Sequence, residues 1–279
     1  MQVSRIDFNS KNASQLFDQS LRNTGFAVIE NHLISYSEIS QTYAEWTRFF
    51  SNDAKYDYLF QPTTQAGYFP FKSENAKDSK VKDLKEFFHI FPSTLLPNGV
   101  DAITKLIQRK LIDTAKVLLG WLQIELPETI RQSLSMPLPD MITDSQSTLF
   151  RIIHYPPLGT ELETGAVRAA AHEDINLLTL LPAATSPGLQ VKSLDGSWFD
   201  VPCDPGSLVV NSGDMLHLAT GGYYPSTTHR VMNPPKNEAS RSRYSMPLFL
   251  HPRGEVPLSK QVTAHTYLNQ RLRELGLIQ

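Results

Sequence analysis

The sequence predicts an α+β protein built around a double-stranded β-helix (jelly roll), with a helical segment before this core and a helix after it. Two observations support this prediction. Apolar residues in the first part of the chain recur at three- and four-residue spacing, which is typical of amphipathic helices. After about residue 147, short β-rich runs alternate with proline and glycine turns, and Asp195-Gly196 is a strong hairpin signal. Many short strands of this kind favour a sandwich or jelly roll over a parallel sheet.

Residues 1–125 are expected to form a helix-rich segment that packs on the core. Gly25 should end its first helix. An aromatic stripe on the second helix indicates core packing rather than a cofactor site. In chain order we expect a helix over 10–24, a strand over 26–29, a helix over 35–51, a loop over 61–80 and a helix over 101–122.

The jelly-roll core is expected over residues 147–252, fused to the preceding segment because no flexible linker separates them. Residues 253–279 should form a C-terminal helix, with a helix over 259–275 that Ser259 caps and Gly276 ends. The strands of the core are expected at 149–153, 175–181, 188–192, 198–201, 207–210, 228–232 and 243–250.

Composition excludes several classes of function. The chain has 279 residues, of which 41% are hydrophobic and 19% charged, as in ordinary globular proteins. A net charge of −2 gives no electrostatic reason to expect a nucleic-acid or membrane partner, and no apolar run approaches the ~18 residues of a membrane-spanning helix. Cys203 is the single cysteine, which excludes an intramolecular disulfide and favours a cytoplasmic location. Nothing in the sequence specifies an oligomeric state.

The most informative motif is His172-Glu173-Asp174. If residues 171–180 form one strand, the side chains of His172 and Asp174 project from the same face and Glu173 projects from the other. His229 follows on another predicted strand 55 positions after Asp174, and a jelly roll can place such distant strands side by side. Two imidazoles and one carboxylate on one side of a metal leave open positions, as in non-haem Fe(II) oxygenases. Zinc can use the same ligands, so the residues alone do not select the metal.

A second group of residues suits a dicarboxylic acid. Arg243 and Ser245 are two apart on a predicted strand and therefore share a face. A guanidinium forms two charge-assisted hydrogen bonds with a carboxylate, and a hydroxyl adds a third. Tyr68 and Phe69, on the loop before the core, are candidates for lining the substrate mouth, with simple packing of an aromatic loop as the alternative.

Taken together, these motifs resemble the iron- and 2-oxoglutarate-dependent dioxygenases of the isopenicillin-N-synthase-like superfamily. The resemblance covers nearly the whole chain, and the ordered series is more specific than any one motif. The N-terminal Gly25-Phe26 strand and the helix end Arg48-Phe49-Phe50 belong to it. In the core it includes Leu149-Phe150-Arg151-Ile152-Ile153-His154-Tyr155-Pro156-Pro157, His172-Glu173-Asp174, Gly188-Leu189-Gln190-Val191, Asp195-Gly196-Ser197-Trp198, Pro205-Gly206-Ser207-Leu208-Val209-Val210-Asn211-Ser212-Gly213-Asp214, Ser226-Thr227-Thr228-His229-Arg230-Val231 and Arg243-Tyr244-Ser245.

The resemblance implies site roles residue by residue. Fe(II) would be bound by His172, Asp174 and His229, with O2 as a further cosubstrate. The 5-carboxylate of 2-oxoglutarate would be bound by Arg243 and Ser245, and Tyr155 would contact the same cosubstrate.

Three positions depart from the pattern of the family. Glu173 stands where many relatives have threonine, and Ile153 stands where plant members often have asparagine. His229 and Arg243 are 14 positions apart, a longer interval than usual, and we expect a turn over 234–237 to absorb the difference.

The implied function is oxidative decarboxylation of 2-oxoglutarate coupled to hydroxylation or another C–H oxidation of a small organic substrate, whose identity the sequence does not specify. One alternative is an iron-dependent oxidase or synthase of the same superfamily that does not use 2-oxoglutarate. Another is a catalytically inactive jelly-roll binding protein. Oxygen uptake that depends on 2-oxoglutarate separates the first possibility from the oxidase or synthase. Anaerobic Fe(II) titration followed by an activity screen separates it from the inactive binding protein.

Overall fold

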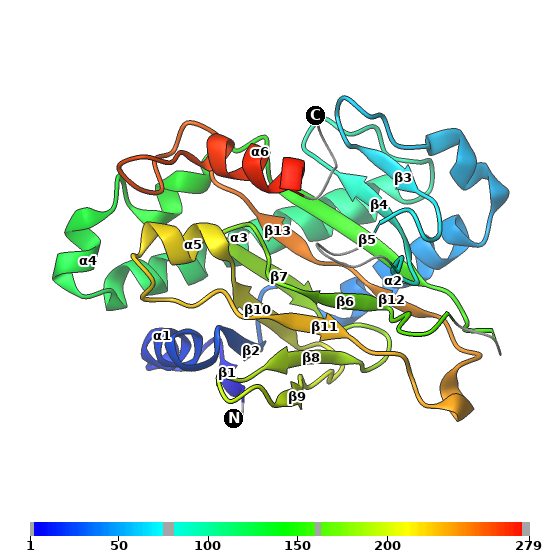
Figure 1. Ribbon diagram of the computed structural model, residues 1–279, viewed down its shortest axis with the longest axis horizontal. Coiled ribbons are helices and arrows are strands. Elements are labelled where there is room, and N and C mark those ends of the chain that lie inside the picture. The colour runs from blue at the N-terminus through cyan, green and yellow to red at the C-terminus, as the bar shows by residue number, and fades with distance from the viewer. Residues whose placement is uncertain (1–2, 75–80, 160–162, 275–279) are drawn as a thin grey trace.

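The structure is a computed structural model that describes residues 3–74, 81–159 and 163–274 (Figure 1). Its helices are α1 (Ala13–Thr24), α2 (Tyr36–Phe50), α3 (Asp101–Glu125), α4 (Glu128–Ser133), α5 (Asp214–Ala219) and α6 (Ala264–Glu274), with short 3-10 helices at Asp53–Tyr58, Leu138–Ile142 and Lys236–Glu238. Its strands are β1 (Ser4–Asp7), β2 (Phe26–Glu30), β3 (Gly67–Phe69), β4 (Glu86–Ile90), β5 (Leu149–Tyr155), β6 (Ala169–His172), β7 (Leu178–Pro182), β8 (Leu189–Lys192), β9 (Trp198–Asp200), β10 (Leu208–Ser212), β11 (His229–Val231), β12 (Arg243–Ser245) and β13 (Leu248–Leu250). Among the described helices, none is both long and apolar enough to cross a membrane.

Within the described residues the strands form two sheets. The larger has nine strands in the order β1-β2-β10-β7-β13-β5-β4-β3, with β12 also paired to β5, and the smaller has the order β6-β11-β8-β9. Side chains from both sheets join one buried cluster, so the two sheets pack face to face as the predicted jelly roll. The N-terminal segment is less purely helical than expected, because β1, β2, β3 and β4 extend the larger sheet at both of its edges.

Alternation along β5 separates the two faces of the larger sheet. Ile153 and Tyr155 point into the cluster between the sheets, whereas Phe150 and Ile152 point into the core under the helices. The larger sheet therefore lies between the smaller sheet and the N-terminal helices, with α3 behind it in the view of Figure 1. This layering leaves the space between the sheets for the functional side chains.

The first two helices predicted from the sequence are confirmed. α2 begins after Ser35, whose hydroxyl accepts a hydrogen bond from the Glu38 amide while the Glu38 carboxylate accepts one from the Ser35 amide. α1 ends at Gly25, which has a φ of 71°, and a methyl group there would lie 2.2 Å from the Thr227 hydroxyl oxygen. Both helices match the predicted ranges to within three residues.

The predicted single strand over residues 171–180 is wrong. β6 ends at His172 in the smaller sheet and β7 begins at Leu178 in the larger one, so the intervening residues cross between sheets. The Asn176 side chain fixes this crossing by donating hydrogen bonds to the Leu178 carbonyl and the Thr179 hydroxyl. Asp174 therefore lies on a connection and not on a strand face.

Other differences have local causes. The strand expected over 243–250 is divided into β12 and β13 because Pro247 has no amide hydrogen for the ladder, although its carbonyl accepts from the Arg151 amide. The tail helix begins at Ala264 and not after Ser259, while its expected stop at Gly276 lies outside the described residues. Sequence reasoning also missed β1, β4, α5 and the strand β3 within the expected loop.

The aromatic core beneath α2 should contribute strongly to stability. Trp46 is fully buried, contacts the rings of Phe49, Phe50 and Phe88, and donates from Nε1 to the Thr104 hydroxyl at 2.9 Å. We expect Trp46→Ala to lower the free energy of unfolding by about 3–5 kcal/mol, because it leaves a large cavity. Urea denaturation measures this change. Leu194→Ala is the control because Leu194 is fully exposed, and equal stability of the two variants would contradict the prediction.

Candidate metal centre and adjoining cavity

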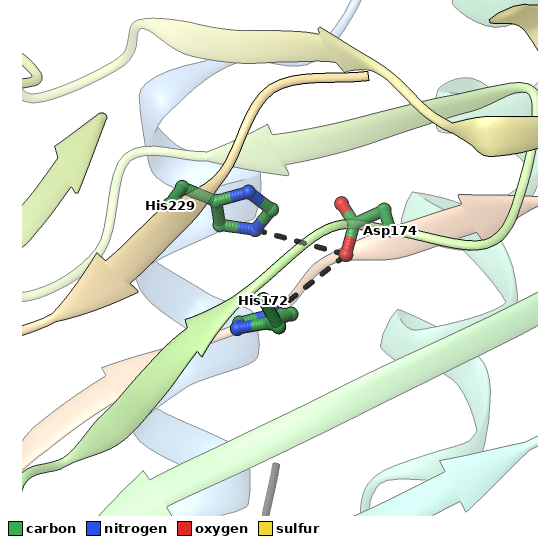
Figure 2. A group of neighbouring side chains, drawn as sticks. All are labelled: His172, Asp174 and His229. Atoms are coloured by element: carbon green, nitrogen blue, oxygen red, sulfur yellow. Dashed lines mark ion pairs between the residues drawn. The ribbon is translucent and has the colours of Figure 1, made fainter. Parts of the chain in front are cut away.

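The structure brings together the three residues singled out from the sequence as metal ligands. Ligand atoms of His172, Asp174 and His229 all lie within 4.8 Å of one another. The Asp174 Oδ1 atom is 3.9 Å from His172 Nε2 and 3.7 Å from His229 Nε2, and Figure 2 shows both imidazoles turned toward this carboxylate. An ion at about 2.1 Å from each atom needs facial ligands about 3 Å apart, so each distance from Asp174 to an imidazole has to shorten by about 1 Å and the largest separation in the group by up to about 2 Å.

Pairing of the two strands that carry the histidines places them side by side. β6 and β11 are antiparallel neighbours in which His172 lies opposite His229. Each imidazole places Nδ1 against a backbone carbonyl, that of Ala170 at 2.7 Å or that of Thr227 at 3.1 Å. Since a carbonyl only accepts, Nδ1 carries the proton in both rings and Nε2 keeps its lone pair. Both Nε2 atoms are therefore prepared to bind a metal.

The carboxylate of Asp174 is oriented by two hydrogen bonds. Its Oδ2 atom accepts from the Thr179 hydroxyl at 2.5 Å and from the Asn211 amide at 2.9 Å, which leaves Oδ1 facing the imidazoles. The backbone is held as well, because the Asp214 amide donates to the Asp174 carbonyl. Gly213 is required for this close approach, since a methyl group there would lie 2.3 Å from the Asn176 carbonyl oxygen.

Electrostatics favour the protonation states that a metal needs. Burial, followed by the charge that His229 would carry, lowers the pKa of His172 to about 4. Burial alone would raise the pKa of Asp174, but the two histidines and the hydrogen bonds from Asn211 and Thr179 hold it below its ordinary value. At neutral pH His172 is thus neutral and Asp174 is ionised, as metal ligands must be. Glu173 is outside this group and accepts a hydrogen bond from Thr228.

A cavity of about 410 Å³ opens beside the metal group. Its lining includes His172, Asp174, Phe249 and His251, together with Leu268 of the C-terminal helix α6. Such a volume is in the range of small-molecule sites. The sequence predicted α6 but not its position, which makes the helix part of the cavity wall.

One wall of the cavity carries a network of opposite charges. Arg151 lies over the rings of Phe87 and Phe249, donates from Nε to His89 at 2.7 Å, and pairs with Glu74 at 3.1 Å. Lys85 pairs with Glu74 at 2.7 Å and with Asp83 at 2.9 Å. Although burial opposes ionisation, these partners hold the pKa of Glu74 well below its ordinary value and raise that of Lys85. The side chains of this wall are therefore charged, but their positive and negative charges nearly cancel.

His251 should make stability depend on pH. Burial lowers its pKa from 6.5 to about 4 in the folded protein. As pH falls below about 6.5, the unfolded chain binds the proton first, so the free energy of unfolding should fall by up to about 3 kcal/mol and level off below about pH 4. His172 acts in the same direction. Metal-free His251→Gln should therefore lose less stability than metal-free wild type in chemical denaturation between these pH values, and equal losses would contradict this assignment.

The residues predicted to hold a dicarboxylic acid lie on β5 and β12, two paired strands of the larger sheet. Arg243 is opposite Tyr155, and its guanidinium carbon is 5.0 Å from the centre of the Tyr155 ring. Arg243 donates from Nε to the Ser186 carbonyl at 2.9 Å, but its buried Nη1 has no hydrogen-bond partner among the described residues. Ser245 is buried on the same strand. An unpartnered guanidinium nitrogen of this kind fits the carboxylate of a ligand.

Tyr68 and Phe69 do not line the cavity, which corrects the expectation that they form the substrate mouth. They lie on β3, where alternation sends Tyr68 into the core under the helices and Phe69 between the sheets. The Tyr68 hydroxyl donates to Glu86, and Phe69 stacks on Phe60 and Phe87. These two aromatic side chains therefore pack in the protein interior, as the alternative interpretation predicted.

Sequence reasoning missed two arginines near the predicted site residues, Arg151 and Arg168. Arg151 lies on the same face of β5 as Ile153 and Tyr155, so the period of two along this strand was a signal available in the sequence. Arg168 precedes β6, whose register shifts against β11, so strand alternation from His172 does not locate it.

The chain belongs to the 2OG-Fe(II) oxygenase superfamily. Residues 146–252 match the model of that superfamily, and residues 3–102 match the model for the N-terminal part of the non-haem dioxygenase in morphine synthesis. The protein is accordingly an Fe(II)- and 2-oxoglutarate-dependent oxygenase, as its resemblance to the family predicted.

Similar proteins span nearly the whole chain. A crystal structure of a protein from Shewanella oneidensis described as an oxygenase is 46% identical over 100% of both chains, with a TM-score of 0.90. A 2OG-Fe(II) oxygenase family protein from Caulobacter crescentus is 27% identical over 98% of both chains, with a TM-score of 0.77. Gibberellin 2-beta-dioxygenase 1 of Arabidopsis thaliana is 28% identical over 88% of this chain and 77% of its own.

Proposed function

We propose that His172, Asp174 and His229 bind the Fe(II) of this oxygenase. The observation that supports this most strongly is the preparation of each ligand atom. Both Nδ1 atoms face backbone carbonyls and Asp174 Oδ2 faces two donors, so both Nε2 atoms and Oδ1 are the free acceptors that converge on one point. When bound, Fe(II) supplies the chemistry that couples conversion of 2-oxoglutarate and O2 into succinate and CO2 to oxidation of a substrate C–H bond.

We propose that Arg243, Ser245 and Tyr155 hold 2-oxoglutarate. Arg243 would bind the 5-carboxylate through its unpartnered Nη1, and the Ser245 hydroxyl would donate to the same group. Tyr155, opposite Arg243 in the ladder, would place its ring and hydroxyl along the cosubstrate. The protein contributes orientation here, because the guanidinium is already held by the Ser186 carbonyl before the ligand arrives.

We propose that a small organic substrate occupies the cavity beside His172 and Asp174. Phe249 and Leu268 offer apolar surface for its carbon skeleton. The wall formed by Glu74, Lys85 and Arg151 offers both donors and acceptors, so it suits polar groups of a substrate that is neutral overall. A cytoplasmic location and the absence of a nucleic-acid partner stay predictions from cysteine content and charge.

The test is an aerobic screen of small molecules with the iron-loaded protein. We expect O2 uptake and succinate formation to require 2-oxoglutarate and to rise when a substrate from the panel is oxidised. O2 uptake with substrate but without 2-oxoglutarate would favour the oxidase or synthase alternative. Fe(II) binding without any turnover across the panel would favour the inactive binding protein.

A further inference from the structure

Arg168 is a buried cation that the roles assigned so far do not use. Its side chain is only 1% exposed, which makes it one of the largest fully buried side chains of the protein. One nitrogen, Nη2, donates to the Arg241 carbonyl at 3.2 Å, and Nε has no hydrogen-bond partner among the described residues. No carboxylate of residues 3–74, 81–159 or 163–274 forms an ion pair with it. A buried guanidinium without an anion is costly to the folded protein.

The position of Arg168 explains what such a charge could bind. Its guanidinium carbon is 5.8 Å from the centre of the Tyr155 ring, and that of Arg243 is 5.0 Å from the same ring. Burial, followed by the positive charge of Arg243, lowers the pKa of Arg168 to about 10, so Arg168 stays charged at neutral pH. Two buried cations beside one ring, each with an unpartnered nitrogen, favour a shared anion.

Arg168 lies on the cosubstrate side because its guanidinium shares the Tyr155 ring with that of Arg243. It comes directly before β6, the strand that ends at His172, and β6 pairs with β11 through a shifted register. A dicarboxylic 2-oxo acid that begins at the metal group and ends near Arg243 would therefore bring its far carboxylate to the two guanidinium groups beside this ring. One carboxylate has enough lone pairs to accept from two guanidinium groups.

We propose that Arg168 is a second cosubstrate-binding arginine, which binds the far carboxylate of 2-oxoglutarate together with Arg243. The inference depends on the proposed cosubstrate site and extends it by one residue. It predicts that this protein selects strongly for 2-oxo acids with a second carboxylate, since a monocarboxylic analogue leaves two buried cations without an anion.

The experiment compares Arg168→Met, which removes the charge and keeps the length, with Arg168→Lys and with Arg230→Met. The control arginine lies on β11 of the same sheet and contacts Trp198 and Gln190. Each Fe(II)-loaded protein is titrated anaerobically with 2-oxoglutarate and with 2-oxobutanoate, which lacks the far carboxylate. We expect Arg168→Met to raise the Kd for 2-oxoglutarate about 10- to 100-fold, with Arg168→Lys intermediate. The Kd for 2-oxobutanoate and all values for Arg230→Met should change less than about twofold.

Thermal unfolding of the metal-free protein separates a binding role from a structural one. Because Arg168→Met removes a buried charge that lacks an anion, its Tm without ligand should equal or exceed that of the wild type. An unchanged Kd for 2-oxoglutarate, or an equal rise for both acids, would overturn this inference alone. If the wild type binds no 2-oxoglutarate, the proposed cosubstrate site fails and this inference fails with it.

Discussion

Asp174→Asn is expected to abolish Fe(II) binding while the fold is preserved. The Thr179 hydroxyl and the Asn211 amide both donate to Oδ2, so an asparagine would place its carbonyl oxygen there and turn its NH2 group toward the two histidines. An NH2 group donates hydrogen bonds and does not bind a cation. We expect Fe(II) affinity to fall at least about 100-fold, the upper end of losses seen for residues outside the ligand shell.

Anaerobic Fe(II) titration and succinate formation measure the effect of Asp174→Asn. The matched control is Glu173→Gln in the adjacent position, because the Glu173 carboxylate is directed to Thr228 and not to the metal group. The control should bind Fe(II) like the wild type. Wild-type affinity in Asp174→Asn would remove this carboxylate from the proposed metal site, and lost affinity in both variants would indicate that the whole connection between β6 and β7 is sensitive.

Arg243→Met is expected to weaken 2-oxoglutarate binding without affecting Fe(II) binding. A hydrogen bond to a charged group is worth about 1.5–3 kcal/mol, so the Kd should rise about 10- to 100-fold. Turnover at low 2-oxoglutarate should fall by the same factor and recover at high concentration. Arg243 is held by the Ser186 carbonyl through Nε, so the loss of that contact should reduce stability only slightly.

The two arginines proposed to bind the cosubstrate can be compared in one series. If both bind the same carboxylate, the loss of affinity in Arg168→Met with Arg243→Met should differ from the sum of the single losses. If Arg243→Met were saturated by the same concentrations of 2-oxoglutarate as the wild type, the role proposed for Arg243 would be contradicted. A fall in Fe(II) affinity in that variant would instead indicate damage that reaches the metal group.

Features encoded in short stretches were predictable from the sequence. The helices α1, α2 and α3 follow from apolar spacing, and the end of α1 follows also from Gly25. The turn at Asp195-Gly196 likewise connects β8 and β9 as expected. These signals depend on residues within a few positions of one another, so they can be recognised without knowing which other helices or strands pack against them.

The ends of strands and their sheet membership were not predictable in the same way. The apolar run after Asp174 suggested one strand, but the chain passes from the smaller sheet to the larger one within it. β1 is a strand because it pairs with β2 at one edge of the larger sheet, and β4 is a strand because it pairs with β5 on one side and β3 on the other. Pairing with a strand that is distant in the sequence decides whether such segments form strands and which sheet they join.

The sequence by itself determined the helices α1, α2 and α3, the jelly-roll class and the identity of the residues that converge at the metal group, because each is encoded by a short period or by an ordered series of motifs. Only the tertiary structure decided how those residues are used. It placed Asp174 on a crossing held by Thr179 and Asn211, closed the cavity with α6, and brought Arg168 to the Tyr155 ring beside Arg243. These relations join residues that are far apart in the chain, and they exist only once the two sheets pack and burial sets the hydrogen bonds and charges between them.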